Sequence, residues 1–243
     1  MRVHQQPAYV LLNRPYSESS WIVEVFSRDY GRLALMAKGA RRIKSRLKGV
    51  LLPFQPVLLS WVGKGAIPTL TSAEIQPSEL NLIEHELTGE RLVCGFYCNE
   101  LIVYLLHRHD PHIKLFNDYH HTILSLHKAK FASRNLREFE QKIIKEIGYA
   151  VNFKFEADGK TRITSDSHYQ FLPGQGFVSV PSDHKKATSG RVIIGLQTGS
   201  SIDFYPADNS PGKQLMRDIL NQTLGYKKIN SRELFYAGGK QFN

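Results

Sequence analysis

The chain of 243 residues contains only two cysteines and no long apolar run. Cys94 and Cys98 cannot form the disulfide framework of a small secreted domain, which indicates a reducing compartment. No run of about 18 apolar residues is present, so we expect no membrane-spanning helix and no membrane partner. The opening residues MRVHQQP lack the apolar segment of a signal peptide. The sequence therefore predicts a cytoplasmic protein.

The sequence also lacks the motifs of common catalytic sites. It has no GxSxG, no GxxxxGK[ST], no GxGxxG that opens a helix, no CxxC and no HExxH. Its acidic residues are scattered without the paired spacing that a nuclease metal site would need. We therefore expect a protein that is not an enzyme and uses no metal or cofactor.

One cluster of metal-binding residue types needs a separate interpretation. Cys94 and Cys98 lie four residues apart on a predicted helix, and five histidines follow them near Asp110: His107, His109, His112, His120 and His121. One alternative is a metal site, since residues four apart share a helix face. The other is a pair of buried thiols with histidines that cap a helix end. The missing ligand motifs favour the second.

Acidic residues are scarce relative to basic ones. The chain has 32 Lys and Arg against 22 Asp and Glu, a net charge of +10, which favours a polyanionic partner. Residues 1–80 carry a net charge of +6, residues 81–210 are neutral, and residues 211–243 carry +4. The densest stretch, KGARRIKSRLK at 38–48, holds six cations and no acid. It is either a solvated loop or a loop that binds phosphates.

The first 80 residues read as short strands separated by turns. We expect strands at 8–12, 21–26, 32–37, 57–62 and 67–73, with a hairpin turn at 63–65. About five strands of this spacing predict a small closed barrel. The basic stretch falls between the third and fourth strands, where we expect a mobile connection. Small barrels with such a loop commonly bind single-stranded nucleic acid.

The remainder reads mostly as helices. We expect helices at 89–109, at 112–127, and at 136–147 with Asn135 as cap and Gly148 as terminator. Residues 149–205 lose helical periodicity; 169–172 and 177–180 predict a hairpin, and 181–190 a polar linker. A last helix runs from Pro211 to Gly225, followed by a basic tail at 227–235. The fold class is α+β, with domains at 1–80, 81–150, 151–210 (the insertion) and 211–243.

Aromatic residues in the barrel region have two interpretations. Trp61 shares an alternating face with Val57 and Leu59, which favours a place in the core. Tyr16 and Tyr30 lie at turns, so they are the better candidates for stacking on nucleobases.

Short motifs in a fixed order resemble the RecO family of bacterial recombination mediators. The resemblance covers nearly the whole chain and weakens between 155 and 210. The motifs are YVL at 9–11, RPYSE at 14–18, YGR at 30–32, AKGAR at 37–41, KSRLKG at 44–49, LPF at 52–54, GKG at 63–65 with TL at 69–70, FYCNEL at 96–101, LREFE at 136–140, IGY at 147–149 and SRELF at 231–235.

This resemblance implies an N-terminal OB-fold barrel and a C-terminal helical domain. It implies binding of single- and double-stranded DNA and annealing of complementary strands in the nucleoid. It also implies binding of the acidic C-terminal tail of the single-stranded-DNA-binding protein (SSB). Together with RecR, a protein of this family would help to load RecA onto SSB-coated DNA. Many family members hold zinc with four cysteines in the insertion. This chain has no cysteine after residue 150, so we expect no zinc there.

By position, the resemblance implies DNA contacts by Lys38, Arg41, Arg42, Lys44, Arg46 and Lys48. We add Arg32 and Lys64, also basic residues of the barrel region, to the expected contacts. The charge of the C-terminal segment suggests a second DNA contact through Lys227, Lys228 and Arg232. Arg137 in the LREFE segment matches a basic residue near the SSB-tail pocket, where a guanidinium can pair with a terminal carboxylate.

Two other functional classes stay open from the residues alone. An OB-fold protein that binds RNA or the ribosome is one, because phosphate contacts do not distinguish RNA from DNA without 2′-OH recognition. A metal-dependent nuclease that uses the histidine cluster is the other.

Overall fold

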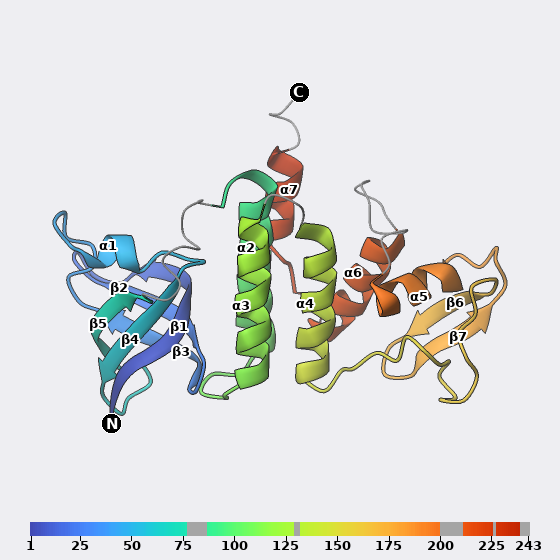
Figure 1. The fold of residues 1–243 in the computed structure, drawn as a ribbon, viewed down its shortest axis with the longest axis horizontal. Coiled ribbons are helices and arrows are strands. Elements are labelled where there is room, and N and C mark those ends of the chain that lie inside the picture. Colours follow the sequence, from blue (N-terminus) through green and yellow to red (C-terminus); the bar gives the residue numbers. More distant parts are fainter. Residues whose placement is uncertain (77–86, 129–131, 200–210, 226, 239–243) are drawn as a thin grey trace. The chain divides into compact units, whose positions relative to one another are not determined.

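The computed structural model describes residues 1–76, 87–128, 132–199, 211–225 and 227–238 (Figure 1). The chain forms two compact units. Unit 1 comprises Met1–Lys130 together with Ile229–Asn243, and unit 2 comprises Phe131–Lys228. In the described ranges no helix combines the length and apolar character needed to cross a membrane.

Unit 1 contains a closed barrel of five strands. These are β1 (Arg2–Pro15), β2 (Trp21–Ser27), β3 (Gly31–Ala37), β4 (Pro56–Val62) and β5 (Thr69–Ile75), in the order β1-β2-β3-β5-β4. β4 pairs with both β5 and β1, so the sheet closes on itself. The predicted α+β class with an N-terminal OB-type barrel is confirmed.

The barrel core follows from period-2 alternation of apolar residues. The inner side chains include Val10, Val25, Leu35, Leu59 and Trp61, each at most 1% exposed. The predicted core position of Trp61 is therefore confirmed.

The barrel closes over a short contact between β3 and β5. These strands are parallel and pair only at Met36 and Thr69. Beside this pair, Met36 N–H donates to the Pro68 carbonyl at 2.8 Å. The rest of the β3 edge is bounded by segments that are not strands of the barrel.

Besides the short helix α1 (Leu47–Val50), the described part of unit 1 has three helices: α2 (Gly89–Leu105), α3 (Ile113–His127) and α7 (Ser231–Gly238). The prediction that the first helix reaches His109 was wrong. Leu106 already has extended dihedrals, and His109 N–H donates to the Arg32 carbonyl at 2.9 Å. This backbone bond to β3 replaces a further helical turn.

The prediction that the helix from Pro211 is the last one was also wrong, because a further helix, α7, begins within the basic segment at Ser231. Its first amides are held by α2: the Glu100 carboxylate accepts from Asn230 N–H at 2.8 Å and from Ser231 N–H at 2.9 Å. A carboxylate at a helix N-terminus satisfies its free donors and suits its dipole.

The described residues of unit 2 form three helices and a small sheet. They are α4 (Ala132–Glu146), α5 (Gly190–Thr198) and α6 (Pro211–Thr223), with strands β6 (His168–Leu172), β7 (Gly176–Val180) and β8 (Thr188–Ser189). The predicted hairpin and the helix that begins at Pro211 are confirmed. Gly148 and Gly225 have the left-handed φ values, +85° and +60°, expected after helices.

Two boundaries in unit 2 differ from the prediction. α4 begins at Ala132, so Asn135 lies within the helix and is not its cap. α5 occupies a region predicted to lack helix, with the Ser189 side chain accepting from Arg191 N–H at its start. Residues 200–205, the end of that predicted region, lie outside the described residues.

The insertion is packed around phenylalanines. Phe177 is fully buried, and its ring centroid lies 5.3 Å from that of Phe171 and 5.8 Å from that of Phe153. Aromatic pairs at these separations stabilise a small core beyond their area of contact.

Candidate nucleic-acid interface

The basic stretch lies in the connection between β3 and β4, residues 38–55, which we call the basic connection. Both of its ends are anchored in the barrel: Ala40 and Leu51 are fully buried in the barrel core. Between them the backbone forms successive turns and the short helix α1 (Leu47–Val50), seen beside the barrel in Figure 1. The anchors place the intervening basic residues at the surface.

The basic connection is also bonded to the β1–β2 turn. Arg41 N–H donates to the Ser19 carbonyl at 2.9 Å, and the Arg41 guanidinium donates to the Ser17 carbonyl. The Asn13 amide donates to the Leu51 carbonyl at 2.7 Å. These bonds join two loops of the barrel into one surface.

The six cations of the basic connection are exposed to solvent. In the part of the chain that the structure describes, no ion pair joins any of them to a carboxylate: Lys38, Arg41, Arg42, Lys44, Arg46 and Lys48. Six positive charges on one short connection create a potential that attracts a polyanion.

Ile43, in the middle of these cations, was missed by the sequence analysis. Its side chain is 94% exposed, more than any other large apolar side chain in the described residues. Tyr16 on the bonded β1–β2 turn is 61% exposed. A single isoleucine flanked on both sides by basic residues in an acid-free stretch was the signal available. The surface thus combines charge with groups that can contact bases.

Arg32 has a different environment from the other expected DNA contacts. Its guanidinium donates to the Val103 carbonyl and lies 3.4 Å from the Glu24 carboxylate, which Arg108 also contacts at 2.6 Å. Burial lowers the pKa of Arg32 from its ordinary value, while the Glu24 charge opposes that shift. Arg32 joins β2, β3 and the α2–α3 connection, and it is not part of the exposed surface.

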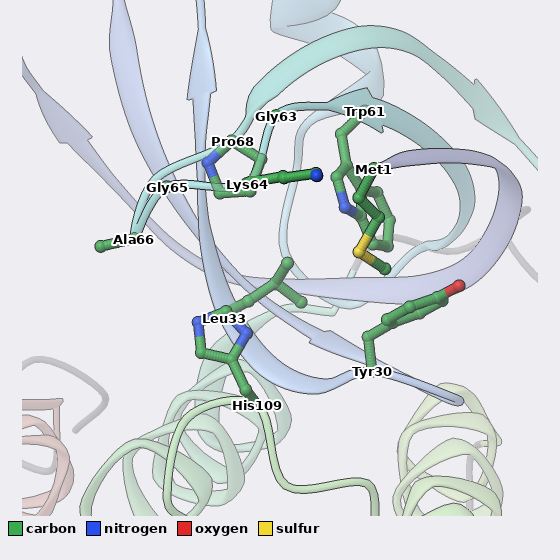
Figure 2. A pocket seen from close by; sticks show the side chains of 10 residues that line it. All are labelled: Met1, Tyr30, Leu33, Trp61, Gly63, Lys64, Gly65, Ala66, Pro68 and His109. Carbon is green, nitrogen blue, oxygen red and sulfur yellow. The ribbon is translucent and has the colours of Figure 1, made fainter.

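Lys64 and Tyr30 lie together elsewhere on the barrel. Lys64 is exposed on the β4–β5 connection, and Tyr30 packs edge-on against Trp61 with ring centroids 5.3 Å apart. Both residues line one cavity (Figure 2). Tyr30 is half-buried, so less of its ring is available than at Tyr16.

The second expected cluster is divided between the two units. Lys227 and Lys228 belong to unit 2 and are exposed, whereas Arg232 belongs to unit 1. The Arg232 guanidinium lies over the Tyr97 ring, 5.7 Å from its centroid, in a cation–π contact.

Arg137 lies on α4 with 9% of its surface exposed. Its guanidinium pairs with the fully buried Glu140 carboxylate at 2.6 Å, one helical turn away. The residue expected to bind the SSB tail thus already holds a carboxylate within unit 2.

The histidines and cysteines do not gather into a metal centre. Cys94 and Cys98 are buried, His112 lies 3.4 Å from Asp110, and His120 shares a 2.6 Å hydrogen bond with the Tyr9 hydroxyl. Within the described ranges no three His, Cys, Asp or Glu side chains are grouped to hold an ion.

Comparisons with known proteins agree with this geometry. Residues 1–78 match the family model "Recombination protein O N terminal", and residues 86–233 match "Recombination protein O C terminal". A "DNA repair protein RecO" of Coxiella burnetii is 37% identical over 239 residues, covering 97% of this chain and 99% of the relative. One from Burkholderia lata is 41% identical, covering 96% and 82%, and one from Nitrosospira multiformis is 38% identical, covering 96% and 95%. The chain belongs to the RecO family of DNA repair proteins.

Proposed function

We propose that this protein binds DNA through the basic connection, acts without covalent chemistry, and promotes annealing of complementary strands. The observation that carries the proposal is the set of six exposed cations on an anchored connection, without carboxylate partners among the described residues. Each phosphate that such a cation neutralises releases counterions, which favours binding. Two strands held on one basic surface repel each other less, which lowers the barrier to pairing.

The apolar groups on this surface favour unpaired strands. Bases of a single strand expose their faces, whereas bases of a duplex are stacked and paired. Ile43 and Tyr16 supply an aliphatic and an aromatic contact beside the cations. Aromatic side chains stack on bases without sequence preference, and an exposed aliphatic side chain offers an apolar contact to the face of an unpaired base. Duplex DNA would use the same cations but not these base contacts.

We also propose that unit 2 binds the SSB C-terminal tail near Arg137 and that, with RecR, the protein promotes RecA loading. A cavity of about 110 Å³ adjoins α4, lined by Gln141, Ile144, Lys145, Ala150, Val151, Phe153 and Met216. The apolar lining suits the apolar side chain of a C-terminal residue, and Lys145 can pair with the terminal carboxylate of that residue. Arg137, on the same helix, adds a guanidinium whose present partner, Glu140, is also a carboxylate.

A salt titration of single-strand binding tests the DNA part of the proposal. The combined substitutions Arg41→Glu, Arg42→Glu and Lys44→Glu should reduce the slope of log K against log salt by about 0.7 for each lost phosphate contact. The annealing rate should fall with it. The matched control, Lys185→Glu, Lys186→Glu and Arg191→Glu, changes the charge equally at exposed positions of unit 2. An unchanged slope and rate in the first variant would refute the assignment.

The alternative function, binding of RNA or the ribosome by the same barrel, rests on the same cations. Competition of labelled DNA by RNA of matched sequence separates the two. We expect DNA to be retained, and displacement by substoichiometric RNA would favour the alternative.

A further inference from the structure

A cavity of about 400 Å³ lies beside the closure between β3 and β5, and we call it the closure cavity. Figure 2 shows Tyr30 and His109 rising from one side, and Lys64 pointing toward the Trp61 side. The lining residues are Met1, Tyr30, Leu33, Trp61, Gly63, Lys64, Gly65, Ala66, Pro68 and His109.

The closure cavity exists because the barrel is bounded there by two connections. On one side runs the β4–β5 connection, which meets β3 only where Met36 N–H donates to Pro68. On the other side the α2–α3 connection is held against β3 by the bond from His109 N–H to the Arg32 carbonyl. His109 has a φ of +61°, so its backbone is fixed in an unusual conformation.

Gly31 explains how closely the α2–α3 connection approaches. A Cβ atom at Gly31 would lie 2.0 Å from the Asp110 carbonyl oxygen, and Gly31 has a φ of +63°. The next residue but one, Leu33, forms part of the cavity wall. The close approach therefore keeps His109 at the cavity.

The lining has a distinct chemistry. The buried side chains of Leu33 and Trp61 form its floor, Tyr30 and Met1 supply the accessible apolar groups, and the lining includes a lysine and a histidine but no carboxylate. An aromatic heterocycle attached to an anion complements such a site, since the ring contacts the apolar wall and the anion contacts Lys64. Each ring nitrogen of His109 can donate or accept one hydrogen bond, so the imidazole can bind the polar edge of a nucleobase.

We propose that the closure cavity binds a single unpaired nucleotide of a DNA strand, a proposal that rests on the DNA binding proposed above. The base lies against Tyr30 and the Met1 side chain, its edge faces His109, and its phosphate contacts Lys64. The volume is at the lower end for small-ligand sites, about 300–1,000 Å³, which suits one nucleotide. Lys64 then acts as part of a base site separate from the basic connection.

Photo-crosslinking of the full chain tests this site. The probe is an oligothymidylate with one 5-iododeoxyuridine, and the crosslinked residues are mapped by mass spectrometry. We expect crosslinks at residues of the lining, such as Tyr30 and His109. His109→Asp introduces a carboxylate that repels the phosphate, and Asp tolerates the left-handed backbone. The crosslinking yield at the cavity should fall about tenfold, the factor expected when one base contact is lost.

The matched control is His107→Asp, which adds the same charge at an exposed position of the same connection. It should retain the wild-type yield. Tyr30→Leu, which removes the ring and adds no charge, should lower the yield as His109→Asp does. Tryptophan fluorescence checks folding, since Trp21 and Trp61 both lie in the barrel.

The outcomes separate the two proposals. Crosslinks confined to residues 38–48, with normal DNA affinity, would overturn the cavity site and leave the proposed function intact. Equal yields for His109→Asp and His107→Asp would also overturn the cavity site. A wild-type chain that binds no DNA would overturn both.

Discussion

The Tyr119 hydroxyl on α3 donates a hydrogen bond to the Asn99 amide oxygen on α2, 2.5 Å away, and Asn99 in turn donates to the Leu11 carbonyl of β1 at 2.9 Å. Both side chains are buried. The chain of bonds therefore ties two helices to the barrel through groups that have no access to water.

Tyr119→Phe should destabilise unit 1. The substitution removes the donor to a buried amide oxygen, and an unsatisfied buried acceptor costs about 1–3 kcal/mol. Urea unfolding followed by tryptophan fluorescence measures the loss. Tyr16→Phe, at an exposed position, is the matched control and should change the free energy of unfolding by less than about 0.5 kcal/mol.

The same pair predicts a pH dependence. Burial raises the pKa of the Tyr119 phenol well above its ordinary value. The neutral phenol therefore stabilises the folded state fully below about pH 10, where the unfolded phenol is still protonated. Above that pH, the unfolded state ionises first and the stabilisation is lost. The difference in unfolding free energy between wild type and Tyr119→Phe should be constant from pH 7 to 9 and shrink toward pH 11. A constant difference to pH 11 would contradict this.

Gly31→Ala should displace the α2–α3 connection. The new Cβ would meet the Asp110 backbone, which cannot rotate away as a side chain can. Gly89→Ala is the control, because Gly89 also has a positive φ, +56°, but no non-neighbouring atom of the described residues lies within 4 Å of the added carbon. The control measures the cost of the backbone conformation alone, about 1–2 kcal/mol. Gly31→Ala should cost about 1–3 kcal/mol more, and similar values for both would show that the approach to Asp110 relaxes freely.

Ile43→Ser should weaken binding of single-stranded DNA about fivefold, equivalent to about 1 kcal/mol for one base contact. The salt slope should stay unchanged, since no charge is lost. Duplex affinity should also stay unchanged. Ile113→Ser removes an isoleucine that is 51% exposed at the start of α3 and serves as the control. A change in slope would place Ile43 in a structural role within the basic connection.

Arg137→Ala should destabilise unit 2, so its effect on binding of the SSB tail cannot be interpreted alone. Removing the guanidinium leaves the Glu140 carboxylate without this partner in a buried site, at a cost of about 3–5 kcal/mol. Hydrogen exchange at the amides of α4 measures the loss in unit 2, since both tryptophans lie in unit 1.

Arg137→Met combined with Glu140→Leu then separates folding from binding. Replacing the whole ion pair with apolar groups should restore the exchange protection. If Arg137 contacts the SSB tail, this double variant should fold normally, lose tail binding and retain binding of naked DNA. Normal tail binding by the double variant would remove Arg137 from the site.

The sequence predicted the barrel well because its signals are local. Alternating apolar residues and turn residues define each strand, and the strands at 21–27, 31–37 and 56–62 lie within one residue of the prediction. The two terminating glycines of unit 2 were predictable for the same reason. The six cations of the basic connection were also visible as a run without acids.

Features that depend on distant partners were not predictable. α7 is short, and its first amides are bonded to Glu100, 131 residues away, so no local pattern marks it. α5 contains two glycines and three β-branched residues among its first six, which lowers helix propensity, and its tertiary packing compensates. Arg32 was predicted to be an exposed cation, but its contacts with Glu24 and the Val103 carbonyl belong to a partly buried network that no local pattern shows.

The discontinuity of unit 1 affects how the protein is made. Its last helix is synthesised only after unit 2, about a hundred residues later than Lys130. At about 5–20 residues per second, a bacterial ribosome spends roughly 5–20 s on that interval. During that interval, the Glu100 carboxylate lacks the α7 amides that it binds in the folded protein. Unit 1 therefore cannot complete its folding until unit 2 has been synthesised.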